Sequence, residues 1–188
     1  MLILASQSPR RKQLLSQAGV EFTVIPADID ESVRPQECPL DYVQRMAIEK
    51  AQANVKRFPE DLIIGADTIV VLGNEIFLKP TDQNDFRHMM QKLSGKTHHV
   101  FTAVALADQH DTQVIVTDTA VTFRKLTPQE IEDYWKTGEP QDKAGGYALQ
   151  GHAAVFIQSI NGSWTGVIGL PICETLELLK AHSCSAIT

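Results

Sequence analysis

The chain has few cysteines, no long hydrophobic run and no excess of positive charge. Its three cysteines, Cys38, Cys173 and Cys184, are far apart and form neither a CxxC pair nor a zinc-type spacing. No run of about 18 apolar residues is present, which argues against a membrane-spanning helix. The N-terminus also does not show the basic and then apolar pattern of a secretory signal. We therefore expect a reduced, cytoplasmic compartment and no contact with a membrane.

Basic residues are fewer than acidic ones. Lys and Arg number 17 against 23 Asp and Glu, so the formal net charge is −6 and a broad basic surface for stable nucleic-acid binding is not expected. A site for a polyanion must then be a local concentration of arginine and lysine. The HExxH, Walker and serine-hydrolase motifs are also missing. These absences exclude the corresponding enzyme classes.

Predicted strands and helices alternate along the chain, and some neighbouring strands are linked as hairpins. Helices are predicted at 9–18, 39–57 and 82–93, from 127 and from about 170. Strands are predicted at 2–4, 20–25, 62–72, 76–77, 98–107, 113–124 and 153–160. This order predicts an α/β fold with a mixed sheet. The length of 188 residues predicts a single domain over 1–188.

The first 18 residues place cations where a helix dipole disfavours them. Leu2–Leu4 predicts a short buried strand, and Ser8 and Pro9 suit the N-cap and first position of a helix. The first turn then holds three cations, Arg10, Arg11 and Lys12. A misplaced cation costs up to about 1 kcal/mol there, unless an external anion docks at the helix N-terminus. The segment is therefore interpreted in two ways: as a phosphate site, or as a surface helix whose arginines are solvated.

Asp67 interrupts the apolar strand predicted at 62–72. A carboxylate buried without a partner is costly, so we expect either a catalytic base or metal ligand, or an aspartate bonded to its own backbone at a strand kink. The preceding Gly65 indicates a bulge or a close backbone approach. Further carboxylates follow the second strand, at Asp28, Asp30 and Glu31. Carboxylates from two strand ends can share one Mg²⁺, although a solvated acidic loop has the same spacing.

Two lysines and a glycine-rich loop supply further candidates. Lys50 lies on the second predicted helix, and Lys79 is held extended by Pro80, so either could pair with phosphate or simply be solvated. The loop at 139–151 has three glycines that allow close approach to a ligand, and it carries the amide of Gln150.

In their order along the chain, these segments resemble the Maf family of nucleotide pyrophosphatases. The matching motifs are Ser6-Gln7-Ser8-Pro9-Arg10-Arg11, Gly65-Ala66-Asp67-Thr68, Leu78-Lys79-Pro80, the loop from Asp142 to Gly151, and Val167-Ile168-Gly169-Leu170-Pro171. Many members have Glu or Gly where this chain has Leu78. The resemblance implies an elongated, twisted sheet in two lobes around a cleft. It also implies a homodimer and hydrolysis of a nucleoside triphosphate to monophosphate and pyrophosphate with Mg²⁺ or Mn²⁺.

The resemblance also assigns roles to residues. By this resemblance Asp67 is the proton acceptor that activates water, and we expect Glu31 and Asp67 to be the metal ligands. The substrate-binding residues it implies are Ser8, Arg10, Arg11, Lys50, Thr68, Lys79 and Gln150. The Arg11, Thr68 and Gln150 set resembles that of the family's uridine and thymidine subgroup. The chemistry agrees, since a glutamine amide matches O4 and N3–H of uracil or thymine. We therefore expect dTTP and UTP as substrates.

Two other functions are consistent with the same residues. The first is a house-cleaning pyrophosphatase for modified nucleotides. The second is a nucleotide-binding regulator without turnover, since the family has an association with septum formation.

Overall fold

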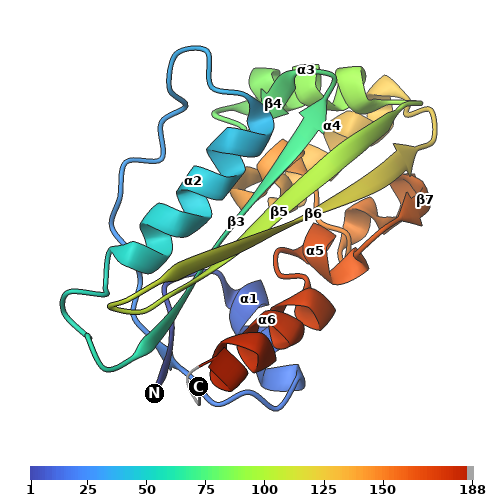
Figure 1. The fold of residues 1–188 in the computed structure, drawn as a ribbon. Coiled ribbons are helices and arrows are strands. Elements are labelled where there is room, and N and C mark those ends of the chain that lie inside the picture. Colours follow the sequence, from blue (N-terminus) through green and yellow to red (C-terminus); the bar gives the residue numbers. More distant parts are fainter. Residues whose placement is uncertain (186–188) are drawn as a thin grey trace.

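The computed structural model describes residues 1–185, together with the side chains up to His182 (Figure 1). A seven-stranded sheet runs in the order β2-β1-β3-β5-β6-β7, and β4 pairs with β3. The strands are β1 (Leu2–Leu4), β2 (Thr23–Val24), β3 (Leu62–Leu72), β4 (Glu75–Phe77), β5 (Thr97–Ala107), β6 (Thr112–Phe123) and β7 (Ile157–Asn161). β1 is parallel to β2 and β3, and the other pairs are antiparallel. The predicted mixed sheet is confirmed.

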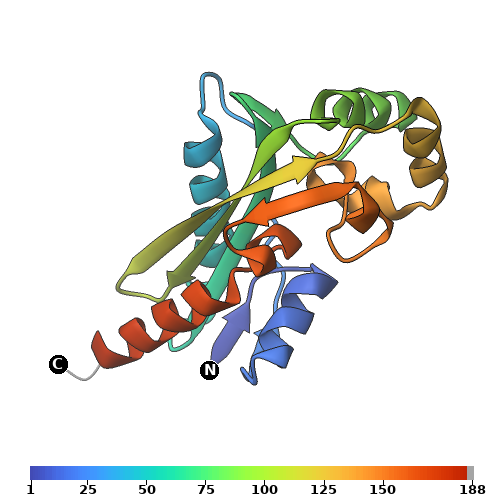
Figure 2. The same ribbon diagram turned by 90° about the vertical axis from the view of Figure 1, so that its right-hand side faces the viewer.

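Helices cover both faces of this sheet. They are α1 (Pro9–Gln17), α2 (Pro39–Gln52), α3 (Gln83–Leu93), α4 (Pro128–Lys136), α5 (Trp164–Ile168) and α6 (Ile172–Ser185). Figure 2 shows α2 on one face and α1, α5 and α6 on the other, with α3 and α4 at the far end. Within the described residues, no helix has the length and apolar composition needed to cross a membrane.

Alternation along β1 and β3 sends side chains into two different cores. Ile3 and Ile63 pack with α2, whereas Leu4 and Ile64 pack with α1 and α6. Gly65 lies where α2 approaches most closely, because an added Cβ would lie 2.2 Å from the carbonyl oxygen of Ala47. The close backbone approach predicted at Gly65 is therefore confirmed.

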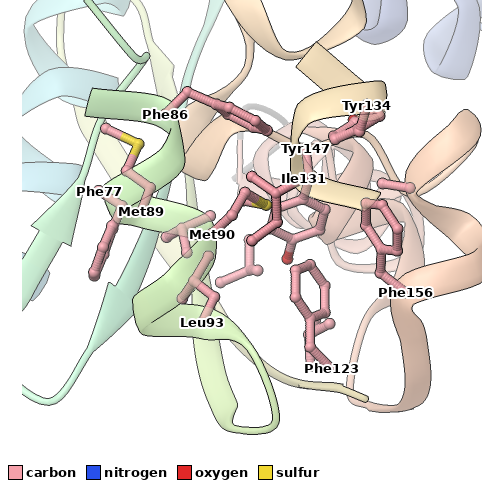
Figure 3. Packing of buried hydrophobic residues seen from close by; sticks show 14 residues of the cluster. Phe77, Phe86, Met89, Met90, Leu93, Phe123, Ile131, Tyr134, Tyr147 and Phe156 are labelled. Carbon is pink, nitrogen blue, oxygen red and sulfur yellow. The ribbon is translucent and has the colours of Figure 1, made fainter. Parts of the chain in front are cut away.

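A third core holds the far end of the molecule together (Figure 3). It joins Phe86 of α3, Tyr134 of α4, Phe123 of β6 and Tyr147 of the loop after α4. The Tyr147 hydroxyl lies 2.8 Å from Nε2 of His98, which is fully buried. Burial lowers the pKa of His98 to about 4, so its imidazole is neutral at pH 7. This packing fixes the glycine-rich loop against α3 and α4.

Local chemistry explains where several elements begin. Thr127 and Glu130 form a capping box at α4: the Thr127 hydroxyl accepts the Glu130 N–H, and the Glu130 carboxylate accepts the Thr127 N–H. Asp82 caps α3 by accepting the N–H groups of Asn84 and Asp85. The predicted starts of both helices are confirmed.

The strand predicted at 153–160 is partly wrong. Its first residues belong to a 3₁₀-helix, His152–Phe156, and only β7 is extended. The Glu139 carboxylate accepts the backbone N–H groups of His152, at 3.0 Å, and Ala153, at 3.5 Å. These donors are therefore not available to a neighbouring strand.

Two other boundaries and one helix differ from the prediction. The strand predicted at 20–25 is shorter and comprises only β2. The Val20 N–H donates to the Leu15 carbonyl at the end of α1, and β1, the strand with which β2 pairs, has only three residues. The helix predicted at 39–57 ends at Gln52 and continues as turns. The short helix α5 was not predicted.

Cysteine pairing is not observed among the described side chains. Cys38 and Cys173 are free and exposed. Cys184 lies outside the described side chains, and residues 186–188 of the predicted domain lie outside the described structure.

Candidate active site

The topology of the sheet creates an opening at the end of β1. β2 and β3 pair with opposite sides of β1, and their connecting helices α1 and α2 lie on opposite faces (Figure 2). In open α/β sheets, ligands bind at such a switch point, outside the carboxyl ends of the strands. The chain that leaves this strand end carries Ser6 and Ser8.

A gap along β3 widens the opening. β3 pairs with β1 over 62–64 and with β4 over 70–72, and among the described residues no strand pairs with 65–69 along that edge. Asp67 and Thr68 lie in this gap on opposite faces of the strand. A cavity of about 750 Å³ reaches both of them around the open edge. Its size is that of small-molecule sites.

All the site residues predicted from the sequence line this cavity. Its lining includes Ser8, Arg10, Arg11, Glu31, Lys50, Asp67, Thr68, Lys79 and Gln150. Asp28 also lines it, whereas Asp30 instead accepts hydrogen bonds from the backbone and hydroxyl of Ser32. The structure thus brings the candidates together in one cavity.

The N-terminus of α1 faces the cavity with its cations. Ser8 is the N-cap and Pro9 the first helical residue, as predicted, but the Ser8 side chain makes no capping hydrogen bond. No acidic residue stands in the first turn. Arg10 reaches across to Asp142 of the glycine-rich loop, 3.8 Å away. The free hydroxyl, the helix N–H groups and the guanidinium form a site suited to an anion.

Arg11 is bonded entirely to neutral groups. Its Nε donates to the Gly169 carbonyl at 2.7 Å, and its two Nη atoms donate to the hydroxyls of Ser6 and Thr68, both at 3.2 Å. It lies deep in the cavity wall, and burial lowers the pKa of its guanidinium. Arginine nevertheless stays charged, so a fixed cation faces the cavity. The arginine also joins segments from both ends of the chain.

Lys50 joins the two carboxylates that were predicted as metal ligands. Its Nζ lies 2.7 Å from Oδ1 of Asp67 and 3.1 Å from Oε1 of Glu31. Asp67 and Lys50 are both about 8% exposed, so each needs the other as a partner. Of the two predicted interpretations of Asp67, the bond to its own backbone is wrong. The carboxylate faces Lys50 and the cavity.

The acidic loop that carries Glu31 is tied to α2. The Tyr42 hydroxyl donates to the Glu31 carbonyl at 2.8 Å. Arg45 donates to the Ser32 carbonyl and, through two nitrogens, to the Glu37 carboxylate at 2.5 and 2.7 Å. These hydrogen bonds from Arg45 are the main reason that the pKa of Glu37 falls from 4.5 to about 2.

Replacing Glu37 with glutamine should remove a pH-dependent part of the stability. Because the folded-state pKa is depressed, ionised Glu37 stabilises the fold above about pH 4.5, and this contribution disappears as the pH falls toward 2. We expect wild type to unfold at a higher temperature than Glu37→Gln at pH 7, with the difference shrinking between pH 4.5 and 2. Thermal unfolding followed across this range measures it. A difference between wild type and Glu37→Gln that stayed the same from pH 7 to pH 2 would contradict the assignment.

The glycine-rich loop closes the other side of the cavity. Its Gly145 N–H donates to the Leu78 carbonyl at 3.0 Å, next to Lys79. Glu139 accepts the Tyr134 hydroxyl at 2.7 Å, and the same hydroxyl accepts the Ala148 N–H. Lys79 and Gln150 are themselves exposed at this side. The loop is therefore a folded part of the wall.

Glu31 and Asp67 are the predicted ligands of a divalent cation. The described residues contain no group of three His, Cys, Asp or Glu side chains that could hold a metal. Glu31 and Asp67 both contact the Lys50 ammonium, so their carboxylates lie close enough together to share one cation. Two carboxylates plus substrate oxygens are a usual set for Mg²⁺. The residues therefore fit that ion.

Sequence reasoning missed two residues behind the site. Thr102 is fully buried and contacts Thr68, and Glu139 holds the glycine-rich loop. The Thr102 contact depends on strand register, which has no signal in a single sequence. For Glu139, the only signal is its place as the first residue of the loop at 139–151.

A mixed sheet with a cavity at its switch point, lined by carboxylates on one side and arginines on another, defines a phosphate-handling α/β protein. The chain matches the Maf family, described as Maf-like protein, over residues 1–182, and it belongs to that family.

Relatives match over nearly their whole length. A protein of Pseudoalteromonas atlantica named dTTP/UTP pyrophosphatase is 50% identical over 98% of this chain and 100% of its own. Proteins with the same name from Hahella chejuensis and Shigella dysenteriae are 48% and 52% identical, over 95% of this chain and 90% and 91% of theirs. Among solved structures, the Staphylococcus aureus Ham1 protein superposes with a TM-score of 0.44 at 14% identity, covering 65% of this chain and 71% of that one.

Proposed function

We propose that the chain hydrolyses dTTP and UTP to the nucleoside monophosphate and pyrophosphate. The relatives at about half identity carry that activity in their names. The observation that carries the proposal is the convergence of Asp67 and Glu31 on Lys50 in the same cavity as the cationic N-terminus of α1. A water activator and a triphosphate site therefore face each other.

Asp67 is the group that we propose as the base. Its Oδ1 is held by Lys50, which orients the carboxylate and leaves Oδ2 to accept a proton from water. The water then attacks the α-phosphorus, and the bond to the bridging oxygen of the pyrophosphate breaks. A divalent cation, Mg²⁺ or Mn²⁺, held by Glu31 and Asp67 would neutralise phosphate oxygens and acidify the water.

Cations around the cavity stabilise the leaving group. Arg10 and Lys79 face the cavity without a close carboxylate partner, since the Arg10 pair with Asp142 is long, at 3.8 Å, and no ion pair is observed for Lys79 among the described residues. Their charges, with the Ser8 hydroxyl and the helix N–H groups, would offset the charge that develops on pyrophosphate. Lys50, which was predicted as a phosphate partner, contacts the carboxylates of Glu31 and Asp67 in this structure.

Arg11, Thr68 and Gln150 form the proposed base site. All three line the cavity, and Thr68, with Arg11 bonded to it, lies on the face of β3 opposite Asp67. We also propose that the protein acts in the cytoplasm as a homodimer with one domain per chain. The free, exposed Cys38 and Cys173 are consistent with a reduced compartment, and the homodimer rests on family resemblance.

Pyrophosphate release from a nucleotide panel tests the proposal. The panel is dTTP, UTP, CTP, 7-methyl-GTP and ITP, each with Mg²⁺, with Mn²⁺ and with a chelator. We expect metal-dependent release mainly from dTTP and UTP. Binding without release from any nucleotide would favour a regulatory protein, and faster release from 7-methyl-GTP would overturn the base assignment.

A further inference from the structure

The acidic loop that carries Glu31 has little structure of its own. It follows β2, which has only two residues, and it continues to the start of α2. Among the described residues, no hydrogen bond between backbone groups involves residues 26–33. Ile29 packs against the core beneath α2, whereas the Glu31 side chain is 54% exposed. The position of the Glu31 carboxylate therefore depends on side chains that bond to this loop from elsewhere.

Two side chains of α2 hold Glu31, one by its backbone and one by its charge. The Tyr42 hydroxyl donates to the Glu31 carbonyl at 2.8 Å. The Lys50 Nζ lies 3.1 Å from Oε1 of the Glu31 carboxylate. In the part of the chain that the structure describes, no other donor bonds to the Glu31 carbonyl. Tyr42 therefore provides the one direct hydrogen bond to the backbone of this residue.

The two contacts respond differently to a bound cation. A divalent cation shared by Glu31 and Asp67 would compete with the Lys50 ammonium, because that ammonium contacts both carboxylates. The Tyr42 bond uses a carbonyl and leaves the Glu31 carboxylate free to bind metal. Tyr42 lines the cavity but is only 2% exposed, and its ring packs in the core beneath α2. Its hydroxyl is thus a fixed donor that a cation does not displace.

We propose that Tyr42 is a positioning residue for the divalent cation: its hydroxyl holds the Glu31 carbonyl and so keeps the Glu31 carboxylate beside Asp67. The proposal rests on the proposed function, because it assigns a support to the cation site that hydrolysis would use. Removing a group that orients a metal ligand typically lowers metal affinity by about 10- to 100-fold. Tyr42 acts on the backbone of the ligand, so we expect the lower end of this range.

Tyr42→Phe tests the proposal, because phenylalanine keeps the ring in the core and removes only the hydroxyl. Mn²⁺ alone is titrated into the full chain, and free Mn²⁺ is measured by electron paramagnetic resonance. We expect the Kd for Mn²⁺ to rise about tenfold in the variant. The Mn²⁺ concentration that half-saturates pyrophosphate release from UTP should rise by a similar factor. An unchanged Kd in Tyr42→Phe, or no binding of Mn²⁺ to wild type, would overturn the proposal.

A double variant distinguishes positioning of Glu31 from a general loss of structure. In a Glu31→Gln background, Tyr42→Phe should weaken Mn²⁺ binding no further, because the ligand that it positions is already gone. Tyr147→Phe is the matched control: Tyr147 is also a buried tyrosine at the cavity wall, but its hydroxyl bonds to His98. Its Kd for Mn²⁺ should stay that of wild type.

The outcomes also separate this proposal from the proposed function. A further loss in the double variant, or an equal loss in Tyr147→Phe, would overturn the role of Tyr42. Wild-type pyrophosphate release from UTP is measured in the same series. If wild type released no pyrophosphate but Tyr42→Phe still weakened Mn²⁺ binding, the proposed function would fail and the role of Tyr42 at the cation site would stand.

Discussion

Asp67→Asn is expected to lower kcat by about 10²–10⁴-fold while nucleotide binding persists. Asparagine keeps the size of the side chain and an oxygen that can accept from Lys50 Nζ, which lies 2.7 Å from Oδ1 in wild type. Its amide nitrogen, however, cannot take a proton from water. Pyrophosphate release measures the loss, and calorimetry with a nonhydrolysable α,β-imido analogue of dUTP measures the binding.

A matched control distinguishes loss of the catalytic base from loss of any carboxylate near the site. Asp30→Asn removes a carboxylate from the acidic loop, but Asp30 does not line the cavity. Its kcat should stay within a few-fold of wild type. If Asp67→Asn kept more than a tenth of the wild-type kcat, the base would have to be another group. If it lost binding as well, the main role of Asp67 would lie in holding the substrate and its metal, and not in proton transfer.

The elements best predicted from the sequence are those whose local signals agree with the final packing. β3, β5 and β6 are long apolar or alternating strands, and α4 has proline and a capping box at its start. Predictions were poorer where a distant side chain captures backbone donors. Glu139 accepts the N–H groups of His152 and Ala153, and no local sequence pattern indicates these hydrogen bonds.

The candidate site was predicted as a set of residues, but its pairings were not. Asp67 was identifiable because a carboxylate in an apolar strand needs a partner. That the partner is Lys50, and that Lys50 also holds Glu31, depends on how α2 crosses β3 at Gly65. Arg11 was predicted as a cation facing an anion, whereas its closest partner is the carbonyl of Gly169, 158 residues away. Such contacts arise from topology, which a single sequence does not encode locally.

Gln150→Glu is expected to lower kcat/KM for dTTP and UTP by about 10²-fold. The glutamine amide offers a donor and an acceptor, which match O4 and N3–H, whereas a carboxylate offers acceptors alone and repels O4. Mismatches at fully buried recognition groups cost about 10⁴-fold or more, and hydrogen bonds at exposed positions cost less. Gln150 is exposed at the cavity wall, so the smaller loss is expected. Steady-state pyrophosphate release from both nucleotides measures it.

The same variant should not gain efficient cleavage of 7-methyl-GTP. Arg11 offers only hydrogen-bond donors whatever stands at position 150, because its own bonds run to Gly169, Ser6 and Thr68. A guanine edge presents donors that a glutamate can accept, but Arg11 adds no acceptor for them. Gln150→Asn, which keeps a shorter amide, serves as the control and should retain the preference for dTTP and UTP at a lower rate. Unchanged selectivity in Gln150→Glu would remove Gln150 from base recognition and leave it to Arg11 and Thr68 alone.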